Sequence, residues 1–170
     1  MKYIVLAIKA IDKTSEIVGK AASCFIILIV LLQLKEVVMR YVFSQTTAWG
    51  WEVVTYMYGI NFILAIPWAL KEGRHIRTDV LFARLSKKQQ TVLDLCTFST
   101  FFLLFCGFLA FFTIKLAVWS TSILETSVFT HTVPVWPLHI ALALGFVLLL
   151  LQGLAKITRD VIFLVKGEAV

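Results

Sequence analysis

The chain has 170 residues, of which 60% are hydrophobic and only 15% are charged. An ordinary soluble domain is about 45–50% apolar and about 25% charged, so this composition favours a protein of the lipid bilayer. The length allows about four or five spans of roughly 20 apolar residues each, with no room for an added ATPase or soluble catalytic domain. The net charge of +6 indicates basic residues that anchor a membrane protein, not nucleic-acid binding.

Four uncharged stretches predict a single all-α membrane domain, residues 1–170, with four transmembrane helices. Each stretch reaches spanning length when the charges at its ends lie in the headgroup region. In chain order we expect an interfacial helix at 1–19, a span at 20–42, a span at 52–70, a basic loop at 71–91, a span at 94–116, a loop at 117–134, a span at 135–157 and a tail at 158–170.

Residues 1–19 have a pattern of their own. At about 100° per residue, the lysines from Lys2 to Lys20 project along one line, and Ile4, Ile8 and Ile11 cluster on the opposite side. This segregation predicts an amphipathic helix on the membrane surface. Apolar residues among the basic residues of 80–88 predict a second interfacial helix in the middle loop.

The basic residues predict the orientation of the chain. Thirteen of the sixteen Lys and Arg residues lie in the N-terminal segment, the middle loop or the tail, which fall on one side of a four-span protein. Lys35, Arg40 and Lys115 lie on the other side, close to span ends. The positive-inside rule then places both termini in the cytoplasm.

The third span predicts which surfaces pack. Small residues such as Cys106 and Ala110 follow one side of this span. The other side carries five phenylalanines, namely Phe98, Phe101, Phe105, Phe108 and Phe112. Small residues let helix backbones approach, so the small face should meet another span and the Phe face should meet lipid or a partner. Ala141 and Gly145 form a similar small pair in the fourth span. Three amides within the spans, those of Gln33, Asn61 and Gln152, are expected to bond between helices.

The candidate reactive residues do not form a catalytic set. The three cysteines lie in apolar runs without a C-x-x-C pair, which excludes a disulfide framework and a zinc site. The three histidines lie at separate loops and a span end, so they supply no facing pair for haem. No nucleophile and base pair and no glycine-rich phosphate loop can be argued from spacing. We therefore expect no cofactor, no metal and no enzymatic activity.

Two polar clusters stand beside the second span. RYVFSQTTAWGWE begins at Arg40 and carries Trp49 and Glu52, and GRHIRTDVLFARL begins at Gly73 and carries His75 and Asp79. Taken singly, the first is an aromatic belt with a solvated carboxylate, and the second is a basic loop with a turn glycine. We expect Glu52 to pair with a cation, either Arg40 or one on a partner, because an unpaired carboxylate at this depth is costly.

The order of these motifs is similar to that of one transporter family. An R-Y-x-F end to the first span, W-x-x-E at the second and H-I-x-x-D after it resemble the small membrane subunit, of the DctQ or SiaQ type, of tripartite ATP-independent periplasmic (TRAP) transporters. The SILETS segment with Glu125, the PVWP segment with Trp136, and a fourth span that ends in LLLLQGLAKITRD also look like that family. The resemblance covers about residues 37–160.

The resemblance implies a place in the inner membrane of a bacterium and a role in secondary transport with three parts. A periplasmic solute-binding protein captures the solute, usually an organic acid such as a carboxylate or sialic acid. A large multi-span subunit of the DctM or SiaM type moves it with a cation gradient, commonly sodium. The small subunit braces the large one and helps to dock the binding protein. The residues expected at partner interfaces are Arg40, Trp49, Glu52, Gly73, His75, Asp79, Glu125 and Trp136, and membrane lipids surround the rest.

Two other classes remain open from the sequence. A self-contained, oligomeric four-span carrier or channel would place a coupling carboxylate or a polar stripe in mid-membrane, where this chain has only three amides. A membrane oxidoreductase would show haem absorbance or a reactive thiol pair, which a visible spectrum of the purified chain would test.

Overall fold

The computed structural model describes residues 2–45, 47–73 and 86–166, and every regular element in these ranges is helical. The elements are α1 (Lys2–Val42), α2 (Ala48–Lys71), α4 (Lys87–Thr97), the π-helical turn η1 (Phe98–Phe102), α5 (Leu103–Ser122) and α6 (Trp136–Lys166). Four helices are long and apolar enough to cross a membrane, namely those at Tyr3–Val42, Ala48–Lys71, Phe98–Ser122 and Trp136–Leu164. This confirms an all-helical chain with four candidate spans. The interfacial helix expected in the middle loop falls mostly on residues 74–85, outside the described ranges.

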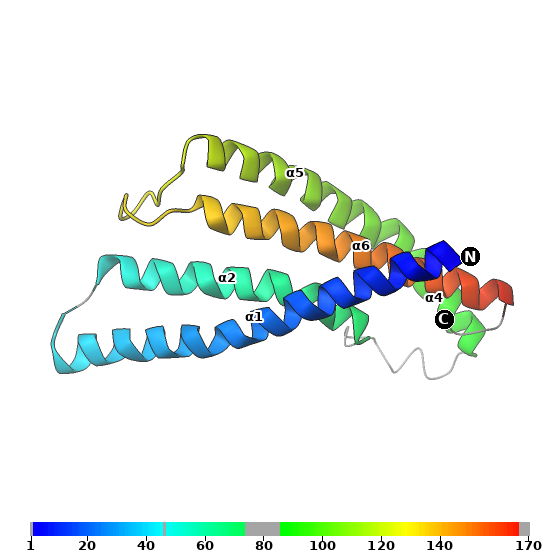
Figure 1. Ribbon diagram of the computed structural model, residues 1–170, viewed down its shortest axis with the longest axis horizontal. Coiled ribbons are helices and arrows are strands. Elements are labelled where there is room, and N and C mark those ends of the chain that lie inside the picture. The colour runs from blue at the N-terminus through cyan, green and yellow to red at the C-terminus, as the bar shows by residue number, and fades with distance from the viewer. Residues whose placement is uncertain (1, 46, 74–85, 167–170) are drawn as a thin grey trace.

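The four long helices lie as a row in the order α1, α2, α6, α5 (Figure 1). Helices α2 and α6 form the middle of the row, α5 packs on α6, and α1 packs on α2 and crosses toward α6 near its N-terminus. The middle position of α6 agrees with its burial. In its most apolar 18-residue stretch, 33% of the residues are buried, compared with 17% in the corresponding stretch of each other span. The outer faces of α1 and α5 are therefore open to lipid or to a partner.

Small residues set the distances between these helices. A Cβ atom at Gly145 of α6 would lie 2.6 Å from Cγ1 of Ile63 on α2, and one at Gly19 of α1 would lie 2.5 Å from Cβ of Trp68 on α2. Ala141, one turn before Gly145, is also buried. The predicted small pair in the fourth span thus lies in a packed surface, as expected where apolar contact alone gives no preference for protein over lipid.

Helix α5 presents the two faces predicted for it. Cys106 and Ala110 are buried, and Phe105, Phe108 and Phe112 are exposed, as is Phe101 of η1. The prediction was wrong for Phe98, which is partly buried, stacks on Phe102 and packs beside Leu70 and Leu149. The π turn explains this difference, because it adds a residue to the turn and rotates the preceding side chains relative to α5.

Helix α1 is continuous through the expected boundary between residues 19 and 20. One seam of buried residues at seven-residue spacing, Ile8, Ser15, Ala22 and Ile29, runs along it. The first half of α1 is also tied to α6 by hydrogen bonds from Ser15 to Gln152 and from Gln152 to Asp12, of 3.0 and 2.8 Å. A membrane-surface position for residues 1–19 stays a prediction.

The helix ends place the connections at two opposite ends of the row. Helix α1 stops where Ser44 adopts a φ of 52° and the amide of Gln45 donates to the carbonyl of Met39, a pattern typical of helix C-termini. We call the end that carries residues 43–45 and 123–135 the loop end. The first turns of α1, the end of α2 and the start of α4 lie at the opposite end, here called the terminal end (Figure 1).

Candidate functional site at the loop end

The structure brings five of the eight predicted interface residues to the loop end. They are Arg40 at the end of α1, Trp49 and Glu52 in the first turns of α2, Glu125 in the α5–α6 loop and Trp136 at the start of α6. Gly73 lies at the terminal end, where its φ of 66° and its amide bond to the carbonyl of Leu70 end α2. His75 and Asp79 lie outside the described residues.

Glu52 is the central group of the loop end. Its side chain is buried, at 6% exposure. Its two carboxylate oxygens accept hydrogen bonds from two hydroxyls of the α5–α6 loop, Ser127 Oγ and Thr130 Oγ1, each at 2.6 Å. A buried carboxylate needs such donors because its desolvation is costly. The two bonds therefore fasten the α5–α6 loop to α2.

The loop that holds Glu52 is itself well ordered by backbone bonds. The amide of Ser127 donates to the carbonyl of Val133 at 2.8 Å, and the amide of His131 donates to the carbonyl of Ser127 at 2.9 Å. Ser127 Oγ also accepts from the amide of Phe129 at 3.1 Å. Ser127 is thus a hub that joins the internal bonds of the loop to Glu52.

The tip of this loop is apolar and points outward. Val128 and Phe129 are 79% and 90% exposed, although both lie next to buried Ser127. A hollow of about 350 Å³ lies beneath Phe129 and is lined also by Trp51, Glu52 and Tyr56, among others. A fixed loop with an exposed aromatic residue at its tip is a surface suited to contact with another protein.

A second carboxylate fixes the α1–α2 connection. Glu36 Oε1 accepts a hydrogen bond from Lys35 Nζ at 3.1 Å and a short one from Thr47 Oγ1. Gly50 makes room for it, since a Cβ atom there would lie 2.2 Å from Glu36 Oε1. Lys35 also lies over the ring of Trp49, with Nζ 4.9 Å from the ring centroid. Trp49 therefore supports the α1–α2 turn while its outer face remains exposed.

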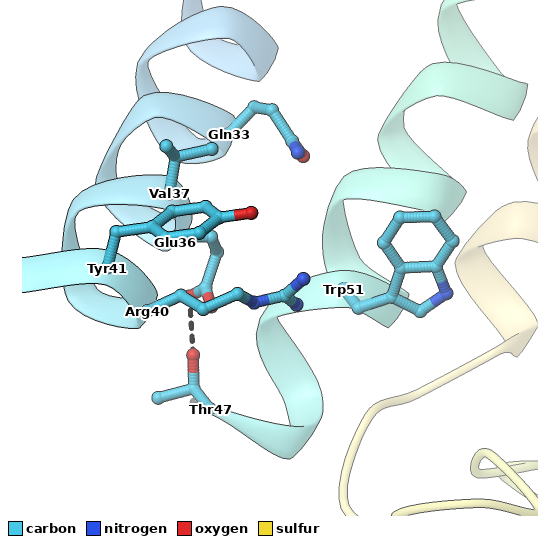
Figure 2. Close-up of a pocket in the computed structure, with 7 residues that line it drawn as sticks. All are labelled: Gln33, Glu36, Val37, Arg40, Tyr41, Thr47 and Trp51. Atoms are coloured by element: carbon cyan, nitrogen blue, oxygen red, sulfur yellow. Dashed lines mark hydrogen bonds between the residues drawn. The ribbon is translucent and has the colours of Figure 1, made fainter. Parts of the chain in front are cut away.

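Arg40 and Glu52 do not pair within the described part of the chain. The partners of Glu52 are the two hydroxyls, and no carboxylate of the described residues lies within ion-pair distance of Arg40. Arg40 instead borders a pocket between α1 and α2 (Figure 2). The alternative, that Glu52 pairs with a cation of a partner subunit, stays a prediction.

Glu125 of the α5–α6 loop contacts His139 in the first turn of α6. Glu125 Oε2 and His139 Nδ1 are 3.3 Å apart, and both atoms are buried without a hydrogen bond of good geometry. The backbone of Glu125 is nevertheless fixed, because its carbonyl accepts from the amide of Val135 at 2.9 Å. Glu125 thus positions the return of the loop into α6, close to partly buried Trp136.

The terminal end carries a polar network that spacing alone did not predict. Asp12 binds Gln152 and makes a close ion pair with Arg159, and Glu16 binds Lys71 at 2.6 Å. These contacts join α1 to both α6 and α2. The expected use of intramembrane amides between helices is confirmed for Gln152 and for Asn61, whose amide donates to the carbonyl of Ala22.

The fold and the polar contacts together define a multi-pass α-helical membrane protein whose polar groups fasten helices and loops to one another. Among residues 2–45, 47–73 and 86–166, no three His, Cys, Asp or Glu side chains are grouped so that they could hold a metal ion. Residues 26–162, well over half of the chain, match the family described as tripartite ATP-independent periplasmic transporters, DctQ component. The chain belongs to this family and is a small membrane component of a TRAP transporter, a non-enzymatic role. No curated protein and no solved structure gives a significant match.

Proposed function

We propose that this subunit braces the large DctM-type membrane subunit and helps to dock the periplasmic binding protein during cation-coupled uptake of an organic acid. The observation that carries the proposal is the contrast between well-fastened polar contacts inside the chain and the apolar surfaces that it leaves open. At the loop end Glu52 binds Ser127 and Thr130, and at the terminal end Asp12 binds Arg159. These residues are thereby used for rigidity and not for solute contact.

The bracing surface is assigned to the outer faces of α1 and α5. Ile27 and Val30 on α1 are 64% and 60% exposed, and Phe105 and Phe108 on α5 are 64% and 60% exposed. Such faces pack equally well on lipid or on another membrane helix, so shape decides the partner. A rigid row of helices offers two such faces to a large subunit.

A cross-linking experiment tests the bracing role. A photoreactive residue is placed at Val30 or Phe108 in the complex, with buried Ala110 as the matched control, at 4% exposure. We expect cross-links to the large subunit from at least one outer face and none from Ala110. If the two chains co-purify but neither outer face cross-links, the assigned surfaces are wrong.

The docking surface is assigned to the tip of the α5–α6 loop. Phe129→Ser should raise the concentration of binding protein needed for half-maximal uptake about tenfold, the loss typical when a central apolar anchor is truncated. Ile123→Ser is the matched control, because Ile123 is exposed at the base of the same loop. Equal effects of the two variants, or none, would contradict a docking role for the tip.

Docking at the loop end requires that this end face the periplasm, with both termini in the cytoplasm. The division of the basic residues, thirteen against three, supports this orientation. In a variant without native cysteines, a cysteine at Thr121 should react with an impermeant thiol reagent from outside, and one at Ser86 should not. Labelling from outside at Ser86 and not at Thr121 would show that the chain has the opposite orientation.

The solute and the coupling ion are expected to bind the large subunit. If so, variants of this chain lower the uptake rate or the amount of complex and leave the half-saturating solute concentration unchanged. Reconstituted uptake with Asp79→Asn over a solute titration measures both quantities. A changed solute preference at unchanged assembly would favour the self-contained carrier instead.

A further inference from the structure

A pocket at the loop end contains a guanidinium group that is not paired with any described residue of the chain. The pocket has a volume of about 150 Å³ and is lined by Gln33, Glu36, Val37, Arg40, Tyr41, Thr47 and Trp51. Figure 2 shows the Arg40 guanidinium, the Tyr41 hydroxyl and the Gln33 amide directed toward the same space, with Trp51 of α2 across from them. Three side chains that can donate hydrogen bonds thus converge on it.

The charge of this pocket favours an anion. Glu36 is its one lining carboxylate, and both Lys35 and Thr47 already donate to that group. The charges of Lys35 and Glu36 balance, so Arg40 leaves the pocket with a net positive charge. A guanidinium presents paired N–H donors whose spacing matches two oxygens of a phosphate or a carboxylate.

The position of the pocket indicates where the anion comes from. Tyr41, Trp49 and Trp51 are exposed around it, as aromatic residues are at the headgroup depth of a bilayer. On the same face of α1, three and four residues apart, lie exposed Ile26 and Val30 and then the pocket residues Gln33 and Val37. The pocket thus continues into an apolar ridge that leads toward the middle of the span.

We propose that this pocket binds the phosphodiester headgroup of an anionic phospholipid of the phosphatidylglycerol class. Arg40 binds the phosphate, Tyr41 and Gln33 donate to its remaining oxygens, and an acyl chain lies on the ridge of Val30 and Ile26. A headgroup with one net negative charge balances the charge of Arg40. The headgroup pocket contains none of the residues assigned to the bracing surface, whereas the acyl-chain ridge shares Val30 with it.

Native mass spectrometry of the full chain in mild detergent tests the site. The chain is titrated with phosphatidylglycerol or phosphatidylcholine, and we expect the wild type to retain the anionic lipid about tenfold more strongly. Arg40→Gln should remove this preference. Lys115→Gln is the matched control, because Lys115 is also a basic residue of a spanning helix, about two turns before the end of α5, but lies over Phe111. Gln33→Leu, which leaves all charges in place, should weaken binding by a smaller factor.

Each other outcome overturns the assignment. Phosphatidylglycerol binding that is unchanged in both Arg40→Gln and Gln33→Leu, or lost equally in Lys115→Gln, would show that the pocket is not the lipid site. Competition by soluble glycerol phosphate as strong as that by the lipid would assign the pocket to a free anion. In the complex purified with the large subunit, loss of that subunit from Arg40→Gln with unchanged lipid retention by the chain would assign Arg40 to a carboxylate of that partner.

Discussion

Replacement of Glu52 by glutamine should loosen the α5–α6 loop without unfolding the helices. The carboxylate accepts from Ser127 and Thr130 at 2.6 Å, and hydrogen bonds to a charged group contribute about 1.5–3 kcal/mol each. Glutamine keeps one acceptor oxygen and replaces the other by an amide donor. One of the two hydroxyls then has no acceptor, and the other donates to a neutral amide oxygen in place of a charged carboxylate oxygen. We therefore estimate a cost of about 2 kcal/mol.

This cost converts into a measurable change in loop opening. A difference of about 2 kcal/mol increases the open population of the loop about 30-fold. Hydrogen–deuterium exchange of the purified chain reports it through the amides of Ser127, Phe129 and His131, which are bonded within the closed loop. Exchange at these amides should accelerate by that factor, and amides in the middle of α2 should be unaffected.

The matched control for Glu52→Gln is Glu72→Gln. Glu72 is an exposed carboxylate at the opposite end of α2, so its neutralisation changes the net charge equally without touching the loop. A double-mutant cycle with Ser127→Ala should show strong non-additivity, since both changes remove the same bond. Unchanged exchange in Glu52→Gln, or an equal rise in Glu72→Gln, would refute the assignment of Glu52 as the loop anchor.

Three further predictions concern packing and the terminal end. Gly50→Ala should lower the thermal unfolding midpoint of the purified chain, because the added Cβ would displace Glu36 Oε1 from its hydrogen bonds with Thr47 and Lys35. A midpoint at or above that of the wild type would contradict this cost. Gly107→Ala should leave the midpoint unchanged or raise it, since nothing lies within 4 Å of the added Cβ and alanine favours a helix interior. Gln152→Leu should destabilise the chain by about 1–2 kcal/mol through loss of its bonds to Ser15 and Asp12, and wild-type stability in denaturant titration would argue against these bonds.

Hydropathy and small-residue spacing predicted the helices and part of their packing. The reason is that both signals are local: the length of an uncharged run reports a span, and residues three or four apart share a face. The buried face of α5 with Cys106 and Ala110 followed from this rule. The rule failed at Phe98, because the π turn interrupts the 3.6-residue period and no proline or glycine in Phe98–Phe102 signals it.

The sequence identified important residues of the loop end but did not predict which residues they contact. Trp49 and Glu52 were singled out, but the partners of Glu52 lie 75 and 78 positions away along the chain. Spacing carries no information about such pairs. The available signal was chemical, since a carboxylate at a span end needs donors and the 126–132 segment contains four hydroxyl residues. The same limit explains why the contacts of Asp12 with α6 could not be predicted.

The distribution of polar contacts suits a subunit that acts as a brace. In a bilayer, apolar helix surfaces slide past one another at little cost, because lipid replaces each lost contact. Register must then come from polar pairs and from small residues that interlock. This chain has both: Glu52 fastens the loop end, Asp12 and Gln152 fasten the terminal end, and Gly145 closes the distance between α2 and α6. Anchors at both ends of a row restrict sliding and tilting together, which a single anchor in mid-membrane does not.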